Sequence, residues 1–273
     1  MNNRPILIVC GMAAAVLFTI VVLGRTVLME SFRRIEADSI ERSIAQVRKA
    51  LHADLKQLEV SNRDYAQWDD AYRFMAEGDR SYIDSNYQAE TLDGLQVDLV
   101  WIVDAAGRDA YSAEHVNGAD TTTSPARLAL LAALRPAIAQ PAEAEALPPE
   151  NRITRFGGRL LAFSLKPILR TDLTGPALGH LVWARFLEQD EIARLRETSQ
   201  LPIEIVDLGS SAQRSMLPAA VREWLTTNPR IAAGLAVPRD AERIDGFALL
   251  HNFEGRATAL LATHMTRSVL MLG

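Results

Sequence analysis

The chain begins with a continuous apolar segment. Residues 5–24 carry no charge, and a helix of about twenty apolar residues is long enough to cross the hydrocarbon core of a bilayer. We therefore expect a short cytoplasmic tail, residues 1–4, followed by a transmembrane helix. A cleaved signal peptide is disfavoured because the apolar run continues to Leu23 and no small-x-small site follows it. A lipid anchor on Cys10 is disfavoured because Val9, rather than a small residue, precedes it.

A periodic pattern follows the apolar segment. Between Thr26 and Asn62 there is no glycine or proline, and charged residues cover all but one face. The apolar face consists of Ile40, Ile44, Val47, Leu51, Leu55 and Leu58. Spacings of three and four predict one amphipathic helix, roughly 50 Å long at about 1.5 Å per residue. Either this stripe pairs with a second copy, making residues 25–62 the stalk of a homodimer, or it packs on the chain's own sheet. The dimer is favoured because the stripe begins as early as Ile35, close to the expected membrane.

An aromatic segment comes next. In the run from Asp64 to Met75, Tyr65, Trp68 and Tyr72 are three and four residues apart, which places them on one face of a predicted helix. Gly78 and Asp79 end that helix, and residues 82–95 are expected to form a loop and a short helix over a sheet.

The first hairpin has a clear turn signal. Residues 97–104 alternate as a strand does, and an Asp-x-x-Gly turn from Asp104 to Gly107 leads into residues 109–112. Further elements are expected in this order: a helix at 126–140, an exposed loop at 141–149, strands at 152–156, 160–168 and 177–186, a helix at 188–198, a strand at 202–207, a helix at 217–226, and strands at 242–252 and 256–263. The class is therefore α+β, an antiparallel sheet with helices on one face. The elements after residue 202 form an appended lobe or extend that sheet.

These segments resemble a known family. The run DYAQWDDAYRFM, then Tyr82-Ile83 and Asn86, then the Asp-x-x-Gly hairpin, is similar to the fourth subtype of the CHASE sensors. The likeness extends over residues 25–267 and is sharpest from 64 to 112. It implies a PAS/Cache-like fold and a periplasmic or extracellular input domain, residues 63–266, of a receptor in the inner membrane. It also implies an output domain beyond residue 273, a histidine kinase or a cyclic-di-GMP cyclase or phosphodiesterase. Residues 267–273 would then begin a second transmembrane helix, although the chain could also end there naturally.

Composition and motifs exclude several functions. The chain is 48% hydrophobic and 23% charged with a net charge of −5, and no basic stripe points to nucleic acid. The five histidines, His52, His115, His180, His251 and His264, lack the spacing of a metal site. No catalytic motif was found in the sequence, so we expect no enzyme activity, no metal and no cofactor within these residues.

Ligand binding is the function that remains. In PAS-like sensors a small molecule binds between the sheet and its covering segments, in a mostly apolar pocket with a few polar groups. The candidate ligand-binding residues are Trp68, Asp69, Tyr72, Tyr82, Asn86, Trp101, Tyr111, Phe163, His180, Trp183 and Arg185. Two alternatives stay open: Arg185 could pair with a nearby acid rather than a ligand carboxylate, and the Trp68 segment could be core. An envelope protein that binds another protein, with no small ligand, is the alternative function.

Overall fold

The computed structural model describes residues 4–116, 119–120, 134, 152–227, 234–240 and 242–267. Of the helix expected at 126–140, only Leu134 is described; it is helical and buried. The loop expected at 141–149 and the segment at 268–273 lie outside the described residues.

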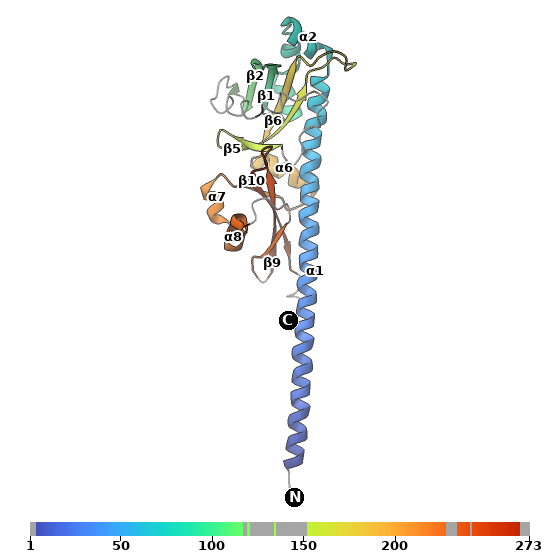
Figure 1. Ribbon diagram of the computed structural model, residues 1–273, viewed down its shortest axis with the longest axis vertical. Helices are drawn as coiled ribbons and strands as arrows, with labels where there is room; N and C mark the ends of the chain where they lie inside the picture. The colour runs from blue at the N-terminus through green and yellow to red at the C-terminus, as the bar shows by residue number, and fades with distance from the viewer. Residues whose placement is uncertain are drawn as a thin grey trace.

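One helix runs along the whole molecule (Figure 1). This helix, α1, extends from Arg4 to Ala66, and two separate sheets lie against its C-terminal half. Among the described residues, no helical stretch is both long enough and apolar enough to span a bilayer. The side chains of residues 1–11 and 13–15 are not among those described, so the transmembrane helix expected at 5–24 stays a prediction.

The first sheet has six strands in the order β3-β2-β1-β6-β5-β4, and every described pairing is antiparallel. Short helices connect α1 to this sheet. The elements are α2 (Asp69–Glu77), α3 (Ser81–Asn86), α4 (Ala89–Leu95), β1 (Leu99–Asp104), β2 (Asp109–Val116), β3 (Ala119–Asp120), β4 (Ile153–Phe156), β5 (Arg159–Pro167) and β6 (Gly179–Phe186).

The C-terminal strands form a second sheet, in the order β7-β10-β9-β8. An extension of the first sheet, one of the two expected arrangements, is therefore wrong, and the appended lobe is the arrangement observed. Its elements are α6 (Gln189–Ser199), β7 (Glu204–Asp207), α7 (Ser211–Met216), α8 (Ala219–Thr227), β8 (Leu235–Pro238), β9 (Arg243–His251) and β10 (Ala257–Thr266). The expected helix at 217–226 corresponds to α8, whereas α7 and β8 had no counterpart among the predicted elements.

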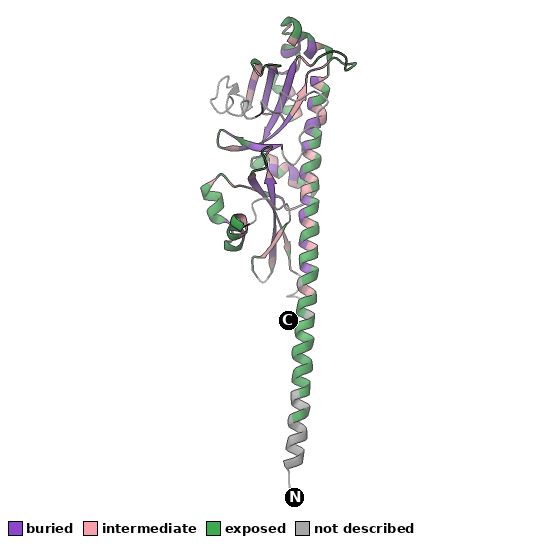
Figure 2. Ribbon diagram, in the orientation of Figure 1, coloured by how far each residue is buried: buried purple, intermediate pink, exposed green. Residues whose placement is uncertain are grey.

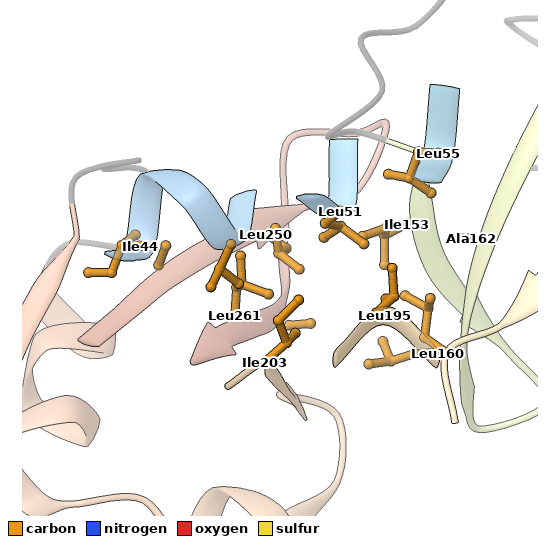
Figure 3. Close-up of a cluster of buried hydrophobic side chains, with 14 residues drawn as sticks. Ile44, Leu51, Leu55, Ile153, Leu160, Ala162, Leu195, Ile203, Leu250 and Leu261 are labelled. Atoms are coloured by element: carbon orange, nitrogen blue, oxygen red, sulfur yellow. The ribbon is translucent and has the colours of Figure 1, made fainter. Parts of the chain in front are cut away.

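The apolar stripe of α1 packs inside the chain. Leu51 and Leu55 lie in one buried cluster with Ile153 of the first sheet and Leu250 and Leu261 of the second (Figure 3). Figure 2 shows this upper half of α1 alternating between buried and exposed positions, while the described part of the lower half is exposed. Packing on the chain's own sheets therefore accounts for Ile40 to Leu58, and dimerisation cannot be argued from those residues. Ile35, by contrast, is 56% exposed.

The predicted first hairpin is confirmed. Asp104 accepts hydrogen bonds at its carboxylate from the backbone N–H groups of Ala106 and Arg108, each at 2.9 Å. The bond from the Arg108 amide is the largest of the causes that lower the pKa of Asp104. Gly107 adopts φ 75°, a left-handed conformation that costs a glycine little. The second predicted turn, Gly157-Gly158, also joins two paired strands, β4 and β5.

The expected continuous aromatic helix is wrong. The helical segments end at Ala66 and resume at Asp69, and Trp68 between them is extended at φ −134°, ψ 136°. Tyr65 and Trp68 therefore do not share a helical face, although their rings still meet edge to face at 6.1 Å. The break turns α2 away from α1 so that it can cover the end of the first sheet (Figure 1).

Candidate ligand-binding site

One group of the predicted residues forms an aromatic cluster between the first sheet and α3. The Tyr82 hydroxyl lies 2.7 Å from the Tyr87 hydroxyl and donates to the carbonyl of Tyr65 at 3.0 Å. Burial raises the pKa of both Tyr82 and Tyr87 well above the ordinary tyrosine value. Trp183 of β6 meets the Tyr65 ring at 4.8 Å, and Tyr111 of β2 stacks on Tyr87 at 5.8 Å. These aromatic side chains pack against one another and fill the space between the first sheet and its covering helices.

Three other predicted residues hold α2 and α3 in place. Asp69 accepts a hydrogen bond from the backbone N–H of Thr171 at 3.1 Å, and the Thr171 hydroxyl accepts one from the Asp69 N–H at 3.2 Å. Tyr72 lies under the Arg170 guanidinium, 4.5 Å from the ring centroid. Asn86 donates to the carbonyl of Tyr82 at 2.8 Å. Trp68 stays partly open, with 38% of its surface exposed.

The remaining strand residues, apart from Arg185, lie on the opposite face of the sheet. Side chains alternate between the two faces of a strand, so Trp101 and His180 face away from Trp183. Trp101 packs on Phe156 at 5.5 Å, and Phe163 meets Phe253 at 6.0 Å. Burial lowers the pKa of His180. The sheet itself therefore separates Trp101, Phe163 and His180 from the aromatic cluster, and the two groups do not line one cavity.

Arg185 is held by acids of the same chain. Its Nη1 contacts Asp54 of α1 at 3.1 Å and Glu191 of α6 at 3.0 Å, and its Nε donates to the carbonyl of Gln96 at 2.7 Å. Arg194 bonds the same two carboxylates. Burial alone would raise the pKa of Glu191, but bonds and charge from Arg194 and Arg185 outweigh it and lower that pKa. Of the two alternatives for Arg185, the structure shows the pairing with nearby acids.

A hollow lies in the second lobe, the part of the molecule built on the second sheet. It has a volume of about 590 Å³, and α6, the α7–α8 connection and the second sheet border it. Its charged and polar lining includes Arg196, Arg239, Arg243, Asp245, Thr263 and His264. None of these was a candidate from the sequence, because they come from four separate segments that only the second sheet brings together.

The chain leaves this lobe beside the helix by which it enters. Arg267, directly after β10, bonds both carboxylate oxygens of Glu36 on α1, the shortest at 3.0 Å. Glu36 is buried, and Arg267 is half-buried. The backbone N–H of Arg267 donates to the carbonyl of Glu242 at 2.7 Å, and its Nη1 donates to that of Asp240 at 3.2 Å.

Comparison with known proteins decides the family. The sequence profile of the CHASE4 domain matches residues 50–206, more than half of the chain. The chain belongs to the CHASE4 family. The resemblance found in the sequence is thereby confirmed. The matched range of this CHASE4 sensor domain covers the C-terminal part of α1 and the first sheet, and it ends within β7.

One curated protein and two solved structures are similar to the chain. The methanogenesis regulatory histidine kinase FilI of Methanothrix harundinacea (strain 6Ac) is 27% identical over 225 residues, which are 82% of this chain and 24% of that protein. The CHASE4 chain thus spans about a quarter of the length of this relative. Among solved structures, the periplasmic domain of Vibrio cholerae LuxQ aligns with a TM-score of 0.50 at 12% identity, covering 82% of this chain and 98% of that one. The extracellular domain of vpHK1S-Z8, described as a histidine kinase, aligns with a TM-score of 0.51 at 10% identity, covering 86% and 96%. These two structures share the fold.

Proposed function

We propose that this chain is the sensory region of a receptor in the cytoplasmic membrane, with residues 25–267 outside the cytoplasm. In this proposal residues 5–24 cross the membrane, and a second span begins after Arg267. A change in the domain passes through the two spans to an output domain beyond residue 273. In this proposal the described residues act in sensing alone, and any enzyme activity belongs to that output domain. A histidine kinase is the output that the relationship to FilI supports, ahead of a cyclic-di-GMP cyclase or phosphodiesterase.

The observation that carries this proposal is the ion pair between Glu36 and Arg267. It joins the helix that enters the domain to the strand that leaves it, at the end of the domain that faces the predicted membrane span. A displacement of α1 relative to the end of β10 separates the buried carboxylate of Glu36 from Arg267, its only cationic partner among the described residues. A free-energy difference of about 1–3 kcal/mol between two such arrangements is enough for an allosteric switch.

Charge reversal tests this coupling. Residues 1–273 are joined to the cytoplasmic part of a histidine kinase that drives a reporter gene. Glu36→Arg or Arg267→Glu alone should change reporter output at least severalfold, and the double variant should return it towards the original level. Glu41→Arg, an exposed position on the same helix, is the matched control. Output that neither single variant changes would contradict the proposal.

A dimer belongs to the same proposal. Among the described side chains, Val27, Met29 and Ile35 are the exposed large apolar residues that follow the predicted span and precede the domain, so a second copy would meet α1 there rather than at Ile40 to Leu58. Cysteine substitutions along residues 26–35 should give disulfide-linked dimers with a helical period of cross-linking.

Protein binding is the second candidate function. Two observations favour it. The first lobe, made of the first sheet and its covering helices, is solidly packed. Leu173, in the loop between β5 and β6, is 57% exposed and adopts a left-handed φ of 62° that leucine rarely takes. A photo-cross-linking residue at Leu173 should capture an envelope protein in intact cells if this candidate is correct. The same residue at Met216, which is also exposed, is the control.

A further inference from the structure

The hollow in the second lobe combines an apolar floor with charged ends. The four-stranded sheet buries one face against α1 and the other against α8. Phe247 and Ala262, on the face towards α8, line the hollow together with Leu217. A volume of about 590 Å³ is within the range of sites that enclose small molecules.

One end of the hollow carries two arginines that share a single acid. Arg239 Nη1 lies 3.4 Å from Asp245 Oδ2, and Arg243 Nε lies 3.1 Å from Asp245 Oδ1. A guanidinium has five N–H donors, so Asp245 leaves most donors of both arginines available. His264 is the direct cross-strand partner of Asp245, and it also lines the hollow. This end therefore has an excess of positive charge and of donors.

The other end carries a third arginine together with one acid, Glu204 of β7. Arg196 donates through Nε to the carbonyl of Ile203, and its terminal nitrogens have no other partner in the described part of the chain. The pairing of β7 with β10 stops at Glu204 and Ala262. Thr263, the next residue, pairs with Gly246, so its side chain lies on the face towards α1, opposite to Phe247, and its buried hydroxyl does not face the hollow. Arg196 is therefore the group at this end that can bind an anion.

Sheet order places these two ends apart. Arg196 is bonded next to β7, at one edge of the sheet, and Arg239 follows β8, at the other edge. A ligand that engages both must have an acidic group at each end and an apolar middle over Phe247. We propose that this hollow binds a small organic diacid, with one carboxylate on Arg239 and Arg243 and the other on Arg196.

The position of the hollow connects it to the exit of the domain. The turn from Arg239 to Arg243 carries both arginines of the first end, and the carbonyls of Asp240 and Glu242 in that turn accept hydrogen bonds from Arg267. Arg267 in turn bonds Glu36. Asp240 and Glu242 are the chain neighbours of Arg239 and Arg243. A diacid that moves these two arginines therefore also shifts the carbonyls that bind Arg267, the residue at which the chain leaves the lobe. The diacid would be the ligand class of the sensor proposed above, but its binding is measured without reference to signalling.

The test is direct binding to the full chain in detergent. Straight-chain diacids of four to ten carbons are titrated by calorimetry, each beside its uncharged diamide. We expect at least one diacid to bind and its diamide not to bind. Arg239→Gln should weaken binding about tenfold, as expected for the loss of a charge-assisted hydrogen bond, and Arg222→Gln, on the exposed side of α8, should leave binding unchanged.

A second variant guards against a loss of folding in the first. Arg239 is largely exposed and Arg243 still holds Asp245 in its absence, so Arg239→Gln should fold. Arg196→Gln removes the terminal nitrogens that have no described partner but keeps an amide that can donate to the Ile203 carbonyl, so it should fold while weakening diacid binding severalfold. The proposal is overturned if no diacid binds at millimolar concentration, if diamides bind equally well, or if both variants bind like the original chain. A diacid that binds but leaves reporter output unchanged would overturn the signalling function alone.

Discussion

Glu59 shows how a single residue attaches α1 to the first sheet. It lies on α1 and is 7% exposed, and its carboxylate contacts Arg152 at 2.8 Å, Lys56 at 3.0 Å and also Lys166. Burial on its own would raise the pKa of Glu59, but hydrogen bonds from Arg152, Lys166 and Lys56 outweigh it and hold that pKa well below the usual range. One buried acid therefore compensates cations from α1, from β5 and from the residue before β4.

Removing this carboxylate should destabilise the protein at neutral pH. Glu59→Gln leaves Arg152 and Lys166 buried without their acid, and breaking a buried pair in this way costs about 3–5 kcal/mol. Because the folded pKa is lowered, the contribution of Glu59 is complete above the unfolded pKa of about 4.3 and is lost as the pH falls below it. Urea denaturation should thus show a large difference between Glu59→Gln and the original chain at pH 7 that shrinks in acid. Glu41→Gln, on the exposed face of α1, is the control; an equal effect there would contradict the assignment.

Arg185 was a candidate ligand-binding residue, and its contribution to stability can be tested in the same way. Its bonds to Asp54 and Glu191 predict that Arg185→Met lowers the free energy of unfolding by about 3 kcal/mol, since two partly buried acids then share Arg194 alone. Chemical denaturation without any ligand measures this loss. Unchanged stability would mean that Arg185 is free to bind a ligand after all.

Elements were predictable where their signals are local. The strands around the Asp104 and Gly157-Gly158 turns follow from alternation and turn residues, which act over a few positions. The break at Trp68 could not be found because residues 64–75 have an unbroken helical period; the bonds between Asp69 and Thr171 that hold α2 join residues 102 positions apart in the chain. For a similar reason, the sequence left open whether the C-terminal strands form a second sheet or extend the first. Short strands such as β8 are defined by their partner, here β9, and not by their own pattern. The charged lining of the second-lobe hollow depends on that sheet and was equally invisible.

Close packing between α1 and β9 gives a prediction at the scale of these elements. A Cβ atom on Gly246 would lie 2.7 Å from Ile40 Cγ1 and 2.9 Å from Ile44 Cδ1. Gly246→Ala should therefore overpack this contact and cost about 1–3 kcal/mol, and adding Ile44→Val should recover part of the loss.

Gly94, in α4, has no heavy atom within 4 Å of an added Cβ, so Gly94→Ala should stabilise by about 0.5–1 kcal/mol. Thermal unfolding of the variants measures both, and a neutral Gly246→Ala would show that α1 can move away from β9 freely.

For the whole molecule, the shared helix predicts that the two lobes unfold together. Leu51 lies in one buried cluster with residues of both sheets, among them Ala162 and Leu250. Leu51→Ala should cost about 2–5 kcal/mol, and hydrogen exchange should rise in β5 and in β10 alike. Faster exchange confined to one sheet would show that the lobes are independent units joined only by the chain.

In the receptor proposed above, the meeting of Glu36 and Arg267 also has a consequence for how the sensory domain can be exchanged. When the two ends of a domain lie side by side, the whole segment can be replaced without changing the spacing of what precedes and follows it, because domains with adjacent termini tolerate insertion. Residues 36–267 then behave as a cassette that carries both members of its closing ion pair. Recombination at this one junction would give an output domain a new stimulus in a single event.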